Sequence, residues 1–173
     1  MAIQLKYMEG KEFVRQALSG ERDFSKTRLE EGFDLSGYES FDELQKYLKN
    51  QNLKENPFAI DYSQLKGVKA IGIYLPYVRG WVADLKGAHL RGADLGGADL
   101  EGADLGRANL WGADLKGAHL GRADLGGADL KAVKNLDEVL NLGEANFCRT
   151  RVSEKEKAII ESALKERPRF IVE

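Results

Sequence analysis

The sequence is dominated by a triplet, Ala-x-Leu, that returns every five residues ten times without a break. It begins at Ala83-Asp84-Leu85 and ends at Ala128-Asp129-Leu130. In an α-helix a step of five rotates the chain by roughly 140°, which would scatter the leucines over every face. In one straight strand an odd step would alternate them between two faces. Only a chain that turns a corner once per repeat keeps every Ala and Leu inside, so the pattern predicts a solenoid.

The five positions of each repeat have distinct physical roles. Ala and Leu lie two apart, so a short extended segment points both inward and points the residue between them outward. The two remaining residues make the corner, and the second of them is mostly glycine, which suits a type II turn with its positive φ. Arg107, Arg122 and Ala132 occupy that position instead, and we expect their corners to use another turn type.

The repeats ADLGG, ADLEG, ADLGR and ANLWG resemble the A(D/N)LXX motif of the pentapeptide-repeat family. The resemblance covers residues 83–130 and implies an all-β solenoid, namely a right-handed quadrilateral β-helix with four repeats per coil. Residues 20 apart would then lie directly above one another. Some members of this family resemble a charged DNA duplex and bind type II topoisomerases, although fold and function are separable.

The same frame continues outside the clear repeats with less regular residues. Upstream, the alanine and leucine positions are taken by Ser63, Leu65, Val68, Ala70, Ile73, Leu75, Val78 and Gly80, which gives fourteen repeats from Ser63 to Leu130. Downstream, residues 145–147 and 150–152 repeat the triplet two residues out of phase, so an irregular segment over 131–144 must absorb the shift. Phe24 and Leu29 are expected in a first coil that a long insertion interrupts.

Four stretches with helical patterning lie outside the regular repeats. They are residues 10–18, 41–49, 136–140 and 154–166. Ser40 with Glu43, and Ser153 with Glu156, have the spacing of a capping box at the start of two of these helices. The helix over 41–49 belongs to the insertion.

Both ends of a solenoid expose coils that need covers, so we expect the first and last helices to act as caps. Ile160 of the last helix should pack on the final coil, although the same apolar stripe could join two chains, which leaves monomer and dimer open. Phe170 and Val172 in the tail are available for packing. We divide the chain into residues 1–62 (helix, first coil and insertion), 63–130 (β-helix), 131–152 (irregular segment and last coil) and 153–173 (capping helix and tail).

Large apolar residues occupy outward positions of the early coils, and these need a cover. They are Ile71, Tyr74, Pro76, Tyr77, Trp81 and Val82. The insertion helix or a partner protein could supply the cover. One outward column also holds Ile71, Arg91, Trp111 and Lys131. An exposed Trp beside Arg is common at the centre of interfaces, but it can equally be a local cation–π pair.

Outward aspartates form two predicted columns, one of Asp84, Asp104 and Asp124 and the other of Asp94 and Asp114. DNA mimicry would need dense negative charge. Residues 83–130 carry eight acidic and five basic residues, a net of −3, over about 12 Å of axis. Duplex DNA carries roughly seven negative charges over that length. The charge density therefore favours the other explanation, in which these side chains hydrogen-bond to the corners.

No catalytic or metal-binding constellation is evident. His89 and His119 are 30 residues apart, which places them on opposite sides, and His119 stacked on Asp99 is typical of a surface pair. No Cys or His spacing is typical of zinc, and the glycines lack the strand and helix context of a phosphate loop. We expect no enzyme activity, no cofactor and no metal.

Composition restricts the class of partner. The net charge of −2 favours neither nucleic acid nor a membrane surface. No stretch suits a bilayer span or a signal peptide, and the single Cys148 allows no internal disulfide, as is typical of cytoplasmic proteins. The sequence thus predicts a cytoplasmic protein-interaction or scaffold module with a protein partner. The interaction surface is expected among Tyr74, Tyr77, Trp81, Arg91, Trp111, Asp84, Asp104 and Asp124. A DNA-mimic modulator of DNA gyrase is the alternative.

Overall fold

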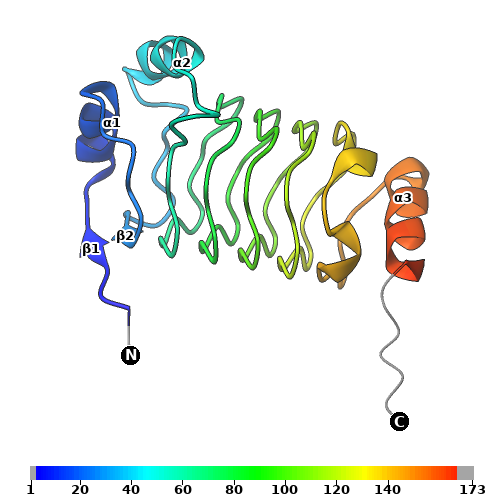
Figure 1. The fold of residues 1–173 in the computed structure, drawn as a ribbon. Helices are drawn as coiled ribbons and strands as arrows, with labels where there is room; N and C mark the ends of the chain where they lie inside the picture. Colours follow the sequence, from blue (N-terminus) through cyan, green and yellow to red (C-terminus); the bar gives the residue numbers. More distant parts are fainter. Residues whose placement is uncertain (1–2, 167–173) are drawn as a thin grey trace.

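The computed structural model describes residues 3–166, which form an elongated solenoid with a helix at each end (Figure 1). The elements in chain order are β1 (Lys6–Tyr7), α1 (Gly10–Leu18), β2 (Thr27–Arg28), α2 (Phe41–Lys49), the 3₁₀ helices η1 (Leu136–Glu138) and η2 (Leu142–Glu144), and α3 (Glu154–Lys165). The strands β1 and β2 pair in parallel, and successive coils are joined by isolated parallel bridges.

The coils stack with a register of 20 residues. Asp84 bridges Asp104, which in turn bridges Asp124. Asp104 donates its N–H to the Ala83 carbonyl of the coil before, at 2.9 Å, and its carbonyl accepts the N–H of Leu85, at 2.8 Å. Since each repeat has five residues, four repeats make one coil, as the resemblance implied. On the other side Asp124 donates its N–H to the Ala103 carbonyl at 2.9 Å, so the segment around Asp104 is hydrogen-bonded to the coils on both sides.

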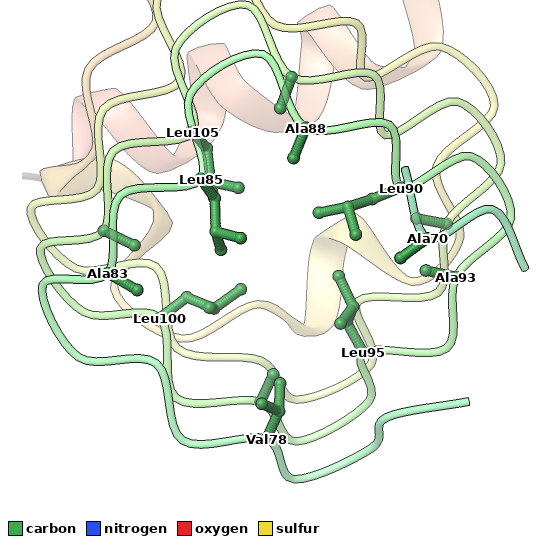
Figure 2. Packing of buried hydrophobic residues seen from close by; sticks show 14 of the residues in the cluster. Ala70, Val78, Ala83, Leu85, Ala88, Leu90, Ala93, Leu95, Leu100 and Leu105 are labelled. Atoms are coloured by element: carbon green, nitrogen blue, oxygen red, sulfur yellow. The ribbon is translucent and has the colours of Figure 1, made fainter. Parts of the chain in front are cut away.

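The interior of the solenoid consists of the Ala and Leu side chains. All ten alanines of the triplets are fully buried, and none of the ten leucines is more than 6 % exposed. Figure 2 shows the leucines reaching toward the centre of the coil from its sides, with the shorter alanines close to the backbone. The upstream frame is also confirmed, because Ser63, Val68, Ile73 and Val78 are buried. Gly80 takes a leucine position because Leu100 fills its space, only 3.0 Å from where a Cβ would lie.

The corners share one backbone conformation whether or not glycine is present. The corner glycines between residues 87 and 127 have φ from +64° to +70°. Arg107, Arg122 and Ala132 have φ of +59°, +58° and +56°. The prediction that these three corners use another turn type was therefore wrong. Hydrogen bonds between stacked coils impose this turn, as when Arg107 donates its N–H to the Gly126 carbonyl at 2.8 Å. They hold the Arg107 backbone in the strained left-handed region.

The first coil has three sides instead of four. Its bridges to the next coil are Asp23 to Ala59, Arg28 to Gln64 and Asp34 to Lys69. The insertion takes the place of the fourth side, and α2 turns the buried Leu44 and Leu48 toward the apolar interior, where a cavity of about 60 Å³ remains. Phe24 and Leu29 are buried in this coil, as expected.

Gln45 of α2 replaces the hydrogen bonds that the missing side would have made. Its side-chain oxygen accepts the N–H of Tyr74 at 2.9 Å, and its amide nitrogen donates to the Gly72 carbonyl at 3.3 Å. Tyr74 is half-buried beside α2, as expected if the insertion helix covers the early coil, and Pro76 is buried as well. In contrast, Ile71, Tyr77, Trp81 and Val82 point outward as expected but stay 40–44 % exposed, so the insertion does not fully cover them.

The helix ends near the first coil are held in different ways. At α1 the Gly10 N–H donates to both carboxylate oxygens of Glu30, at 3.0 and 2.9 Å. At α2 the predicted capping box of Ser40 and Glu43 does not form. Ser40 has φ −93° and ψ 15°, whereas a capping side chain reaches the helix N–H groups from an extended residue.

The C-terminal end confirms the predicted shift of register. The bridge spacing grows from 20 at Asp114–Lys134 to 21 at His119–Leu140 and 22 at Asp124–Asn146. The two increases correspond to η1 and η2, each of which lies between successive bridges and adds one residue.

Helix α3 packs against η1 and η2 and buries Ile160. Its predicted capping box is confirmed, because the Glu156 carboxylate accepts the Ser153 N–H at 2.8 Å and also the Ser153 hydroxyl. Phe170 and Val172 lie outside the described residues, and the division of the chain into four segments stays a prediction. Within residues 3–166 no helix is both long enough and apolar enough to cross a membrane.

Candidate functional site

One exposed corner column combines apolar, aromatic and cationic side chains. We call Ile71, Arg91, Trp111 and Lys131 the Trp111 column. The backbone confirms that they stack, because Gly72 donates its N–H to the Arg91 carbonyl at 2.8 Å and Gly92 donates to the Trp111 carbonyl at 2.9 Å. Ile71 and Trp111 are 44 % and 43 % exposed, and the Arg91 guanidinium lies 4.5 Å from the centroid of the Trp111 ring.

The backbone under Trp111 is held on both sides. Its N–H donates to Asn109 Oδ1 at 3.0 Å, and its carbonyl accepts the N–H of Gly92 from the coil before. The aromatic side chain therefore projects from a fixed corner. A partner that binds there orders little additional chain, which lowers the entropy cost of binding.

The other predicted aromatic residues do not form one site with Trp111. Tyr74 lies half-buried beside α2, through its bond to Gln45. The Tyr77 ring covers Gly97, since a Cβ on that glycine would lie 2.5 Å from the ring. Trp81 packs edge-on against Tyr62 at 5.1 Å. The early coil thus displays its aromatics at successive positions around its circumference, each with a local contact.

The outward Asp and Asn side chains are bound to their own corners. In every case Oδ1 accepts the backbone N–H two residues later, at 2.8 to 3.3 Å. The residues are Asp84, Asp94, Asp99, Asp104, Asn109, Asp114, Asp124 and Asp129. This hydrogen bond explains why the repeat prefers Asp or Asn at this position.

Several of these carboxylates also meet a partner from a neighbouring coil. Asp84 pairs with Lys66 at 3.3 Å. Asp114 accepts the side-chain amide of Asn135 at 2.8 Å, and Asp124 accepts that of Asn146 at 2.9 Å. The aspartate columns exist as predicted, but much of their hydrogen-bonding capacity is used within the chain. This counts against an uninterrupted run of free negative charge.

The carboxyls with shifted pKa lie at turns and helix ends. A hydrogen bond from Arg15 lowers the pKa of Glu12 to about 2. Hydrogen bonds from Ser25 lower the pKa of Asp23, and the backbone N–H of Gly37 lowers that of Asp34. In the part of the chain that the structure describes, each of these shifts is explained by a local hydrogen bond. None of these groups adjoins a nucleophile such as Cys148, which is free and exposed.

The two histidines have different surroundings. His89 lies between Lys69 and Asn109 in its column, and His119 lies above Asp99, as the register predicted. The structure adds Glu101, which sequence reasoning missed: His119 Nδ1 is 3.4 Å from Asp99 Oδ1 and 3.7 Å from Glu101 Oε2. The register could have predicted this contact, because His119 stacks on Asp99 and Glu101 is the corner residue two positions after Asp99.

Comparison with known proteins agrees with this geometry. The family described as pentapeptide repeats matches residues 83–121 and 93–132, with eight copies. The crystal structure of the pentapeptide repeat protein Rfr23 from the cyanobacterium Cyanothece 51142 is 25 % identical, covers 82 % of this chain and 95 % of that chain, and has a TM-score of 0.56. No curated protein sequence matches the chain.

Two further solved structures are more distant. A pentapeptide repeat protein from the Arabidopsis thaliana thylakoid lumen is 24 % identical over 61 % of this chain and 78 % of that chain, with a TM-score of 0.40. QnrB1, described as a plasmid-mediated fluoroquinolone resistance protein, is 16 % identical over 83 % of this chain and 81 % of that chain, with a TM-score of 0.39. At these TM-scores neither structure carries a functional argument.

Proposed function

We propose that this chain, a pentapeptide-repeat protein, is a non-enzymatic right-handed quadrilateral β-helix that acts as a protein-interaction or scaffold module through the Trp111 column. The observation that carries the proposal is the exposed Trp111 ring against the Arg91 guanidinium, with a distance of 4.5 Å to the ring centroid. The equivalent corner position holds glycine at 96 and 106 and lysine at 86 and 116, so the fold does not require a tryptophan there.

The chemistry of the column suits a protein surface as partner. Trp and Arg are the residues that most often dominate the binding energy of an interface. Ile71 adds apolar area two coils away, and Lys131 adds a positive charge at the other end. The complementary surface is therefore a groove or flat patch with apolar residues and a carboxylate to meet Arg91.

The test compares binding by variants that retain the solenoid. Affinity purification with quantitative mass spectrometry is carried out on the wild type, Trp111→Ala and Lys116→Ala, the last being a matched change of the same corner position in another column. We expect a specific protein that the wild type and Lys116→Ala recover equally and that Trp111→Ala loses at least tenfold. Tyr77→Ala with Trp111→Ala tests whether the early coil contributes. Similar melting temperatures of all the variants are required as the control that the solenoid is intact. Equal recovery of partner proteins by all of them would then contradict the proposal.

DNA mimicry remains the alternative function, and the aspartate columns are the observation behind it. A supercoiling assay with purified DNA gyrase separates the two. The interaction proposal predicts neither inhibition nor protection at micromolar protein. Inhibition that disappears when Asp84, Asp104 and Asp124 are all changed to Asn would instead support the mimic, because Asn keeps the corner hydrogen bond, as Asn109 does, and removes only the charge.

We propose that the module is monomeric. Helix α3 buries Ile160 against its own chain, and Ile159 and Ala163 pack on the same core, which leaves Leu164 as its exposed large apolar residue at 37 %. A dimer through α3 would have to separate these contacts. Light scattering at micromolar concentration tests this, and a mass of twice the chain would contradict it.

We also propose a cytoplasmic location. The free and exposed thiol of Cys148 fits a reducing compartment, where such thiols stay reduced. Fractionation of the source cells tests this, and recovery of the protein in another compartment would contradict it.

A further inference from the structure

Three side chains from two consecutive coils bring potential metal ligands together. Asp99 and Glu101 belong to one coil and His119 to the next, and their ligand atoms all lie within 4.8 Å of one another. In residues 3–166 no other three side chains of metal-ligating type meet in this way. Around a tetrahedral Zn²⁺ with bonds of about 2.0–2.1 Å, ligand atoms lie roughly 3.3 Å apart. The separations from His119 Nδ1, 3.4 Å to Asp99 and 3.7 Å to Glu101, need a change of only a few tenths of an ångström.

The backbone fixes this arrangement. Asp99 and His119 are directly bridged across the stack, and Glu101 donates its N–H to Asp99 Oδ1 at 3.2 Å. Residue 121, on the corner above Glu101, is glycine. A Cβ there would lie 3.2 Å from the His119 ring, so the absence of a side chain leaves room for the imidazole to lie over the corner.

A separate observation concerns the other ring nitrogen of His119. The side-chain amide nitrogen of Asn141 lies 2.6 Å from Nε2. Histidines that bind a metal through one nitrogen almost always donate the other N–H to an oxygen. Metal binding at Nδ1 therefore requires the Asn141 amide to flip, so that its oxygen and not its nitrogen faces Nε2. After that flip Asn141 accepts the Nε2 proton and holds the imidazole in the tautomer whose Nδ1 lone pair points at the carboxylates.

We propose that Asp99, Glu101 and His119 bind a divalent first-row cation, with Zn²⁺ as the best fit to one imidazole and two carboxylates. Two carboxylates and a neutral imidazole carry the charge that balances such an ion. The side chains are 50 %, 34 % and 23 % exposed, so the site opens to solvent and leaves a fourth position for water. The ion links two coils. This inference does not depend on the proposed interaction function.

The experiment uses the full chain after metal removal, with ZnCl₂ as the probe. His119→Asn removes the ligand and His89→Asn is the matched control, because both residues occupy the repeat position that Asn109 already fills. Calorimetry should give one equivalent for the wild type and for His89→Asn, with affinity reduced at least tenfold in His119→Asn. Nitrogen NMR of the imidazoles should show the metal shift at Nδ1 of His119 and no shift at His89.

A second readout separates a specific link from adventitious binding. Zn²⁺ should raise the melting temperature of the wild type and of His89→Asn and should leave that of His119→Asn unchanged, because a link between coils stabilises the folded state alone. Three results would overturn the proposal: no binding at one equivalent, equal binding by His119→Asn, or a metal shift at Nε2 of His119. In each case the cluster is a hydrogen-bonded surface group, with Asp99 and Glu101 accepting from the imidazole.

Discussion

Gly97 and Gly117 offer a controlled test of how the outward side chains pack on the solenoid. They occupy the same corner of consecutive coils and have nearly equal φ, +65° and +64°. A Cβ on Gly117 would meet nothing within 4 Å, whereas one on Gly97 would lie 2.5 Å from the Tyr77 ring. Substitution by alanine therefore imposes the same backbone strain at both positions. Only at Gly97 does the new methyl group also collide with a neighbouring side chain, the Tyr77 ring.

The expected destabilisation follows from these contacts. An alanine in the left-handed conformation destabilises the folded state by roughly 1–2 kcal/mol. Alanine also lowers the conformational entropy of the unfolded chain, which offsets about 0.4–1 kcal/mol of this destabilisation. Gly117→Ala should therefore lower the free energy of unfolding by about 1 kcal/mol. Gly97→Ala must in addition displace the Tyr77 ring, and overpacking of this kind costs about 1–3 kcal/mol. Its total should be about 2–4 kcal/mol.

Urea denaturation of the full chain measures the difference. The set comprises Gly117→Ala, Gly97→Ala, Tyr77→Ala and the double variant Gly97→Ala/Tyr77→Ala. We expect Tyr77→Ala to remove most of the additional cost of Gly97→Ala, which gives a coupling of about 1–2 kcal/mol in the double-mutant cycle. Equal effects of the two glycine substitutions, or zero coupling at an unchanged m-value, would refute the placement of the Tyr77 ring over Gly97.

Three further predictions concern the core and the C-terminal end. Leu110→Ala, at a position 1 % exposed, should cost about 2–5 kcal/mol in chemical denaturation, and a loss below 1 kcal/mol would contradict tight interior packing. Ile160→Asp should unfold the last coil before the rest, seen as early loss of amide protection at residues 145–152, whereas an unchanged melt with a change of oligomeric state would contradict self-capping. Burial raises the pKa of Glu156, but hydrogen bonds from Ser153 outweigh it and the pKa is lowered from its ordinary 4.5. The stabilisation is therefore present above pH 4.5 and lost as the pH falls through the lowered value. Thermal melts of Glu156→Gln should differ from the wild type by about 1 kcal/mol at pH 7 and converge in acid, and a constant difference would contradict this.

The periodicity predicted that the chain coils and which side chains point into the interior, and the resemblance to the pentapeptide-repeat family supplied the four repeats per coil. This was possible because Ala and Leu at fixed spacing leave only one geometry that buries all of them. The register then predicts that Asp99 lies against His119 and Arg91 against Trp111, as the bridges and the ring contact confirm.

The errors arose where the stack overrides local preference. Arg107 has the left-handed φ of a glycine because the coils on both sides fix its corner. Ser40 lacks its predicted cap because the insertion enters α2 from a residue that is not extended. Sequence periodicity does not describe an insertion that folds back on the coils.

The cluster of Asp99, Glu101 and His119 could be predicted from the sequence only in part. The register brings Asp99 and His119 together, but Glu101 joins them only because Gly121 leaves space for the imidazole. Asn141 reaches His119 where η1 lengthens the coil by one residue. The register could have placed Glu101 near His119, whereas the contact of Asn141 depends on an irregular segment that no repeat pattern describes.

The central claim is that residues 20 apart lie side by side while residues ten apart lie on opposite sides of the coil. Two double-cysteine variants in a Cys148→Ser background test it: Asp94→Cys with Asp114→Cys, and Asp94→Cys with Asp104→Cys. Adjacent strands lie about 4.8 Å apart, within reach of a disulfide. Mild oxidation should link the first pair within one chain and leave the second pair as thiols, as read by mass spectrometry. Faster linkage of the second pair, which is closer in sequence, would contradict the four-sided stack.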